Sequence, residues 1–135
     1  MEKKVFEIEM KVRDYECDAQ GIVNNANYMH YYEVARHEFL ESRNISFSDS
    51  HDQGIDMVVS KVEINYKSPL KGGDRFLSSL TIEKSGVRMV FHQTLKRKKD
   101  NVLCNLATTE VVILINGSLS LGDYFDEKLA DYLAG

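Results

Sequence analysis

A carboxylate that precedes a predicted helix is the first feature of this sequence that could do chemistry. Asp18 lies 7 residues before Asn25, where a helical pattern begins, and Gly21 between them allows a tight turn. The first N–H groups of a helix lack partners within the helix and carry a partial positive charge. Such groups can stabilise the oxyanion of an acyl-transfer intermediate, and a nearby carboxylate can attack a carbonyl or activate water. Taken alone, Asp18 is better explained as a turn residue, because aspartate is common in turns.

The helix that follows this loop is expected to have one buried side. Between residues 26 and 42, apolar and aromatic residues recur at helical spacing. The members of this stripe are Tyr28, Tyr31, Tyr32, Ala35 and Phe39. Asn25 is the expected N-cap, because an asparagine side chain can accept from an unpaired backbone N–H. Glu33 and Arg36 are three residues apart and are expected to pair.

Strand patterns occupy much of the remaining chain. Strict alternation over residues 6–13 predicts a half-buried strand, whereas residues 14–25 and 43–54 have the pattern of loops. Four further strands are expected after residue 54, and in the first of them Val58 and Val62 should share a face. Their turns are expected at residues 69–74, 85–86 and 99–101, and the last strand at about 102–115. A short C-terminal helix is expected, with Asp123 as its cap and a stripe formed by Phe125, Leu129 and Tyr132.

These elements predict one α+β domain over residues 1–135. The length favours a single domain, and the hydrophobic fraction of 43% is ordinary for a globular protein. A helix that is apolar along one side needs a sheet to cover it. A curved, mainly antiparallel sheet of about five strands around the helix would do so. The sequence does not specify the order of the strands.

Composition argues against several functional classes. The net charge of −4 gives no general attraction to nucleic acid. The two cysteines and four histidines show no metal-site spacing and no disulfide framework. The N-terminal residues lack the apolar core of a signal peptide, and no apolar run reaches the roughly 20 residues of a membrane helix. We therefore expect a cytoplasmic protein without metal, cofactor, nucleic-acid partner or membrane insertion.

Two motifs extend from the Asp18 loop into the helix. One is D-x-x-G-x-V-x-x-x-x-Y, from Asp18 to Tyr28, and the other is Y-x-E-x-A-R, from Tyr31 to Arg36. A weaker Y-x-x-P…G-D pattern lies at residues 66–74. Together these motifs resemble the 4-hydroxybenzoyl-CoA thioesterase family, in particular the branch associated with the Tol-Pal system and small acyl-CoA thioesterases.

The resemblance implies a hot-dog fold, in which a curved sheet wraps one helix, and the hydrolysis of acyl-CoA thioesters. Matched by position, Asp18 is implied to be the catalytic nucleophile or general base. The backbone N–H of Asn25 is implied to polarise the thioester carbonyl. Other residues implied to bind substrate are Gly21, Val23, Ala26 and Tyr28. Relatives place the active site between two subunits, so we expect a homodimer or a homotetramer.

Two other functions stay open at this point. Proteins closer to acyl-ACP thioesterases carry His-Val-Asn-Asn where this chain has Ile22-Val23-Asn24-Asn25, so an acyl-ACP thioester is an alternative substrate. The second alternative is a binding module that senses acyl-CoA without hydrolysing it. A sensor, however, needs no carboxylate at the thioester.

A basic run at residues 96–99 ends one predicted strand. Such a run is commonly a solvated hairpin end. In the other interpretation, Arg97 and Lys98 bind the phosphates of CoA, as surface basic side chains do in the resembled family. Arg88, on the same strand, could join them. The run does not distinguish CoA from an acyl carrier protein, because both are anionic.

Overall fold

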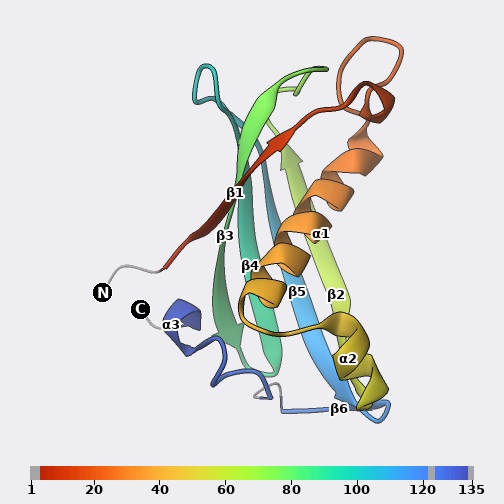
Figure 1. The fold of residues 1–135 in the computed structure, drawn as a ribbon, viewed down its shortest axis with the longest axis vertical. Coiled ribbons are helices and arrows are strands. Elements are labelled where there is room, and N and C mark those ends of the chain that lie inside the picture. Colours follow the sequence, from red (N-terminus) through yellow and green to blue (C-terminus); the bar gives the residue numbers. More distant parts are fainter. Residues whose placement is uncertain (1–3, 122–123, 134–135) are drawn as a thin grey trace.

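The computed structural model describes residues 4–121 and 124–133 (Figure 1). Its regular elements begin with one strand, a single 3₁₀ turn and two helices. These are β1 (Phe6–Lys11), the turn Asp14–Glu16, α1 (Asn25–Ser42) and α2 (Phe47–Asp52). Five strands and a short helix follow. These are β2 (Ile55–Tyr66), β3 (Arg75–Ser85), β4 (Arg88–Arg97), β5 (Leu103–Ile115), β6 (Ser118–Leu119) and α3 (Ala130–Leu133).

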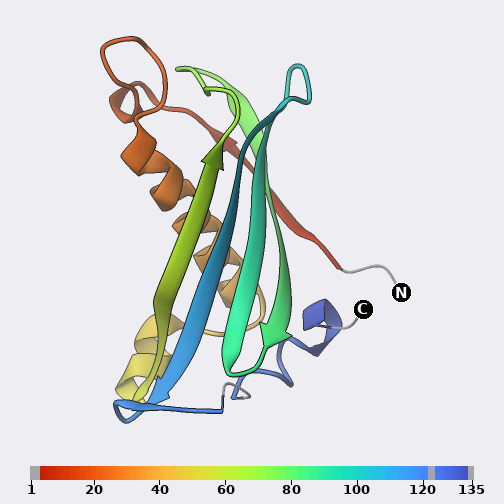
Figure 2. The ribbon, with the colours of Figure 1, turned by 180° about the vertical axis from the view of Figure 1, so that it is seen from behind.

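One antiparallel sheet curves around α1. Its strands lie in the order β1-β3-β4-β5-β2, and the two-residue β6 pairs with β5. Figure 1 shows α1 crossing the concave face, and Figure 2 shows the opposite face of the sheet, which faces away from α1. The predicted α+β class, the five-stranded curved sheet and the single long helix are therefore confirmed. β2 follows the helices in the sequence, yet it lies at the edge opposite β1.

The core lies between α1 and the concave face. The whole predicted stripe of α1, from Tyr28 to Phe39, is buried, and Leu40 joins it. Phe39 packs edge-on against Phe6 of β1 and against Tyr132 near the C-terminus, with ring centroids 5.4 and 4.7 Å apart. None of the helices within residues 4–121 and 124–133 is long and apolar enough to cross a membrane.

Two local predictions need correction, and part of a third lies outside the described residues. Asn24, rather than Asn25, is the N-cap of α1, and its side chain accepts from the N–H of Ala26. Residues 47–52, expected as loop, form α2, with the Ser46 side chain capping its first turn. This helix lacks an apolar stripe, so periodicity did not reveal it. The C-terminal helix is present as α3, while the proposed cap Asp123 lies outside the described residues.

The edge strand β2 contains a bulge that periodicity did not predict. Val59 pairs with Val111 and Lys61 with Glu110, so Ser60 is the extra residue. A bulge shifts the alternation of side chains by one position. Val58 is consequently 40% exposed, and it does not share the face of the partly buried Val62.

Candidate active site

Asp18 lies in a loop that folds back tightly on itself. Cys17 and Val23 form a β-bridge across the loop, and the Asp18 N–H donates to the Ile22 carbonyl at 2.9 Å. Gly21 adopts φ +78°, a left-handed conformation that a side chain disfavours, and its N–H donates to the Asp18 carbonyl. The carboxylate is exposed, and its Oδ1 accepts from the Gln20 N–H at 2.8 Å. Within the described chain, Oδ2 accepts from no protein donor, so it is open to solvent or substrate.

The first turn of α1 has one backbone donor without a protein acceptor. The Asn24 side chain accepts from the Ala26 N–H at 3.1 Å, and the Asn27 N–H donates to the Asn24 carbonyl at 2.9 Å. By contrast, the Asn25 N–H donates to no acceptor in the part of the chain that the structure describes. An oxyanion at this helix end would therefore meet the Asn25 N–H, whereas the Ala26 N–H is already used.

Glu16 connects the Asp18 loop to this helix start. Its backbone carbonyl accepts from the Asn24 N–H at 3.0 Å and from the Asn27 side chain at 2.7 Å. Its carboxylate Oε1 accepts from the Tyr31 hydroxyl at 2.9 Å and from the Arg13 N–H at 2.7 Å. Burial, followed by the bond to Glu16, raises the pKa of Tyr31, so the hydroxyl stays a proton donor. The sequence analysis did not single out Glu16. The only signal in the sequence is its position three residues after Arg13, a spacing typical of a helix cap.

A second segment closes the other side of the helix start. The Val23 N–H donates to the Leu70 carbonyl at 2.9 Å, and the Leu70 N–H donates to the Tyr28 hydroxyl at 3.2 Å. A cavity of about 270 Å³ lies between this segment and the first turn of α1. Its lining includes Ile22, Val23, Asn25, Tyr28, Tyr66 and Pro69.

The structure thus brings together at this cavity Asn25, expected to act in catalysis, and Val23 and Tyr28, expected to bind substrate. Asp18 and Gly21 lie on the loop beside this cavity and do not line it. The β-bridge between Cys17, which precedes Asp18, and Val23, which lines the cavity, holds the Asp18 loop next to the cavity.

A larger cavity, of about 440 Å³, lies between α1 and β2. It begins at Met29, one helical turn after Asn25, and at Val62, four residues before Tyr66 on β2. No sequence pattern indicated this cavity. Its walls come from helices and from strands that are far apart in the sequence, and the sequence did not specify the order of the strands in the sheet. The two cavities follow one another along the same helix and the same edge strand.

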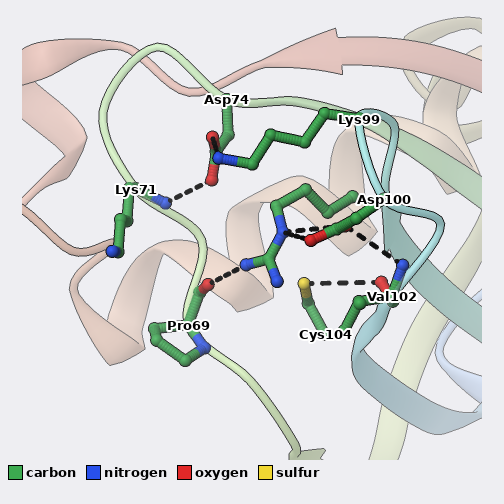
Figure 3. Close-up of polar contacts among 8 residues, drawn as sticks. Pro69, Lys71, Asp74, Lys99, Asp100, Val102 and Cys104 are labelled. Atoms are coloured by element: carbon green, nitrogen blue, oxygen red, sulfur yellow. Dashed lines mark hydrogen bonds and ion pairs between the residues drawn. The ribbon is translucent and has the colours of Figure 1, made fainter.

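The basic run is largely neutralised by neighbouring acids. The guanidinium of Arg97 donates from Nε to both carboxylate oxygens of Asp100 and from Nη1 to the Pro69 carbonyl at 2.9 Å. Lys98 pairs with Glu9. Figure 3 shows the Lys99 ammonium directed at Asp74, 3.6 Å away, and the Pro69 carbonyl facing the β4–β5 hairpin. Arg97 therefore ties this hairpin to the segment that lines the smaller cavity.

Arg88 does not join the basic run. It begins β4, whereas Arg97 ends it, and strand geometry separates residues nine apart by roughly 30 Å. Arg88 lies instead 3.5 Å from Glu110 on β5. The expectation that Arg88 extends the Arg97 cluster was therefore wrong. Binding of CoA phosphates by Arg97 and Lys98 remains a prediction, and it would have to compete with their present partners.

Among the described residues, the other reactive side chains do not gather into a second centre. Burial and the nearby acids Asp14 and Asp18 raise the pKa of the Cys17 thiol, which disfavours the nucleophilic thiolate. His51 pairs with Asp56 and His92 with Glu83. In residues 4–121 and 124–133, no three metal-binding side chains gather at one point.

Comparison with known proteins shows what this arrangement is similar to. Residues 20–104 match the family described as the thioesterase superfamily. An acyl-acyl carrier protein thioesterase of Arabidopsis thaliana, ATL3, is 39% identical over 63% of this chain and 45% of that protein. A putative esterase of Aquifex aeolicus is 35% identical over 81% of this chain and 84% of that protein. Acyl-CoA thioesterase YbgC of Haemophilus influenzae is 28% identical over 84% of each.

The chain therefore spans less than half the length of the plant relative.

Among solved structures, a 1,4-dihydroxy-2-naphthoyl-CoA thioesterase from Synechocystis superposes with a TM-score of 0.87 at 21% identity. The superposition covers 95% of this chain and 97% of that one. It establishes the hot-dog fold expected from the motifs.

Proposed function

Because this chain belongs to the thioesterase superfamily, we propose that it hydrolyses an acyl-CoA thioester to a free acid and CoA. One observation carries the proposal. The loop that bears the exposed Asp18 carboxylate is tied through Glu16 to the first turn of α1, where the Asn25 N–H has no described acceptor. A carboxylate beside an open helix N-terminus is the pair that acyl transfer needs.

The proposed reaction begins with the thioester carbonyl oxygen accepting from the Asn25 N–H. Asp18 Oδ2 then attacks the carbonyl carbon, the carbon–sulfur bond breaks, and CoA leaves as a thiolate. The resulting mixed anhydride is hydrolysed by water, which regenerates Asp18. In the alternative route, Asp18 removes a proton from the water that attacks the thioester directly. Both routes place negative charge on the carbonyl oxygen at Asn25, so both need the open N–H.

The acyl group is proposed to enter the groove between α1 and β2. The smaller cavity, at Val23 and Tyr28, would hold the thioester end, and the larger cavity would hold the rest of the acyl chain. The nucleotide would extend toward the β4–β5 hairpin, where Lys96 is exposed and Lys98 pairs with the exposed Glu9. Within the superfamily, the motif from Asp18 to Tyr28 favours the 4-hydroxybenzoyl-CoA thioesterase branch.

An acyl-ACP thioester is the second candidate substrate. The segment Val23-Asn24-Asn25 and the 39% identity to a plant acyl-ACP thioesterase favour it. Hydrolysis rates measured side by side with the same acyl group on CoA and on acyl carrier protein decide between the two. Tight binding of acyl-CoA with no turnover would instead support a sensor.

Self-association is also part of the proposal. β2 is a 12-residue edge strand with apolar side chains exposed at Val58 and Val59. An edge strand of this kind pairs readily with another chain, so we propose at least a homodimer. We also propose that residues 1–135 act as one domain in the cytoplasm, where the two free cysteines stay reduced. Light scattering should give a mass of two or more chains, and an active monomer would refute the shared site.

Replacing Asp18 by asparagine tests the catalytic assignment. The amide oxygen of the introduced side chain can still accept from the Gln20 N–H, so the loop should keep its shape while the reactive carboxylate is lost. We expect kcat to fall roughly 10²- to 10⁴-fold. Asp14→Asn is the matched control, because Asp14 is an exposed acid nearby whose side chain makes no hydrogen bond within the described residues. The assignment fails if Asp18→Asn and Asp14→Asn have similar activity.

A further inference from the structure

Arg36 reaches from α1 to the concave face of the sheet. Its Nη1 donates to Gln93 Oε1 at 3.1 Å and to Thr109 Oγ1 at 3.4 Å. Both acceptors are essentially buried, with exposed fractions of 1% for Gln93 and 0% for Thr109. The positive charge of Arg36 therefore lies between helix and sheet, where it is poorly solvated.

This charge forms no ion pair within the part of the chain that the structure describes. Glu33, the partner expected from sequence, pairs with His37 at 3.7 Å instead. The acceptors that Arg36 does have are a neutral amide and a neutral hydroxyl, and its Nε and Nη2 donate to no described acceptor. Burial lowers the pKa of Arg36, and the charge of Glu33 opposes this only in part. A guanidinium nevertheless stays protonated, so the site holds a cation whose charge is compensated only in part, by the nearby Glu33.

Arg36 also lines the larger cavity, whose other walls are mostly apolar apart from Glu33 and His37, which lie against each other. The apolar lining includes Leu40, Phe47, Met57, Phe91 and Val111. An ionised group in such surroundings is unfavourable unless a partner pairs with it. A ligand that placed a carboxylate at the free donors of Arg36 would remove this cost, because a guanidinium binds a carboxylate with two parallel hydrogen bonds.

The distance between Asn25 and Arg36 sets the length of such a ligand. The two residues are 11 positions apart on α1, or about 16 Å along the helix axis. Helical side chains lean toward the N-terminus, so the guanidinium lies roughly 10–16 Å from the Asn25 N–H. An extended carbon chain advances roughly 1.25 Å per bond, from its bond length and angle, which corresponds to about 8–13 bonds.

We propose that the larger cavity selects acyl chains that end in a carboxylate, and that Arg36 is the residue that recognises it. The substrate class is then the mono-CoA thioester of a medium-chain dicarboxylic acid. The proposal rests on the proposed thioesterase function and deepens it. The acyl carbonyl lies at Asn25, the methylene chain crosses the apolar part of the cavity, and the distal carboxylate meets Arg36.

The test compares three thioesters that share one chain length of about twelve carbons. These are dodecanoyl-CoA, 12-hydroxydodecanoyl-CoA and the mono-CoA thioester of dodecanedioic acid. We expect the dicarboxylic thioester to have a kcat/KM roughly tenfold to hundredfold above that of dodecanoyl-CoA, the range of a charge-assisted hydrogen bond. Arg36→Met should abolish this preference by losing activity on the dicarboxylic thioester alone, and Arg36→Lys should retain part of it.

A purely structural role of Arg36 gives a different result. In that case Arg36→Met lowers the melting temperature and reduces kcat/KM for all three thioesters equally, which would overturn the proposal. An equal preference for the 12-hydroxy thioester would also overturn it, because a neutral acceptor would then suffice. Lys61→Met, which removes an exposed cation from the neighbouring strand β2, should change neither the preference nor its dependence on Arg36.

Binding to the Asp18→Asn protein separates this proposal from the proposed function. The dissociation constants of dodecanoyl-CoA and the dicarboxylic thioester are measured with Asp18→Asn alone and combined with Arg36→Met. Suppose that the wild-type protein hydrolyses none of the thioesters, while the Arg36-dependent difference in binding is present. In that case only the thioesterase function fails. If hydrolysis depends on Asp18 but neither binding nor kcat/KM favours the dicarboxylic thioester, only the Arg36 proposal fails.

Discussion

Two adjacent tyrosines of α1 allow the positioning of Asp18 to be separated from the stability of the core. The Tyr31 hydroxyl donates to Glu16, which connects the Asp18 loop to the helix start. The Tyr32 hydroxyl donates to Asn105 Oδ1 at 2.6 Å, inside the sheet. Both rings are buried, and each Tyr→Phe substitution removes one hydroxyl while keeping the ring. The two variants are therefore matched in volume and in helix position.

The two substitutions should differ in their effect on stability, because the acceptors that lose a donor lie in different environments. Without the Tyr31 hydroxyl, Glu16 Oε1 keeps its bond to the Arg13 N–H and is partly solvated, so the expected loss is about 1 kcal/mol. Without the Tyr32 hydroxyl, the buried Asn105 amide is left with neither polar atom paired, because its Nδ2 already lacks a partner. The expected loss is then about 2 kcal/mol. For a chain of 135 residues, these losses lower the melting temperature by roughly 3.5 and 7 °C.

The effects on activity should run in the opposite order. Tyr31→Phe removes one of the contacts through Glu16 that hold the loop against α1, so we expect kcat to fall roughly tenfold, since small displacements of a reacting group are costly. KM should change little, because the residues lining the two cavities are unchanged. Tyr32→Phe leaves the Glu16 contacts in place and should keep a kcat close to that of the wild type.

Thermal unfolding and the release of CoA thiol from an acyl-CoA measure both quantities on the same protein samples. Burial raises the pKa of both tyrosines, so both hydroxyls remain donors and the effects should not vary with pH around neutrality. The reasoning is refuted if Tyr32→Phe loses as much kcat as Tyr31→Phe. It is also refuted if kcat follows the melting temperature across the two variants.

Three further predictions concern the helix cap, the hairpin and the nucleotide. Asn24→Ala should cost about 1 kcal/mol, because Ala26 loses its acceptor, and Asn24→Ser should restore most of it in thermal unfolding. The Arg97 hydrogen bond lowers the pKa of Asp100 below its ordinary 3.8, so this pair stabilises the fold above that pH. Asp100→Asn should thus lower the melting temperature at neutral pH, and the difference from wild type should vanish as pH falls through the lowered pKa. Lys98→Ala should raise KM for acyl-CoA but not for the matching pantetheine thioester, and an equal effect on both would contradict phosphate binding.

The features that the sequence predicts correctly are those set by local periodicity. The stripe of α1 and the alternation of β1 repeat with the period of their own element, so their buried faces can be assigned without knowledge of the fold. The motif from Asp18 to Tyr28 lies within one loop and one helix turn, so its geometry is also local. The position of the cap was wrong by one residue because Asn24 and Asn25 are chemically equivalent as caps.

The features that the sequence did not predict depend on residues far apart in the sequence. The place of β2 beside β5 decides where the two cavities lie, and pairing between strands about 50 residues apart has no local signature. The bulge at Ser60 turns Val58 outward, although the sequence around it continues to alternate. Glu16 has an ordinary loop sequence around it, and its role is apparent only when the partners on α1 are seen.

The start of α1 is built in a way that leaves its positive end unneutralised. Its first turn contains no acidic residue, although acids there commonly stabilise a helix. Asn24, Asn25 and Asn27 are neutral, and the carbonyl of Glu16 accepts from Asn24 and Asn27, whereas the Glu16 carboxylate bonds to Tyr31. A capping box would place an acidic or amide side chain at position 27 against the Asn24 N–H, but that N–H already donates to Glu16. The helix is thus capped by neutral groups that leave the Asn25 N–H open, so the charge that develops on a substrate oxyanion would meet no competing carboxylate within this first turn.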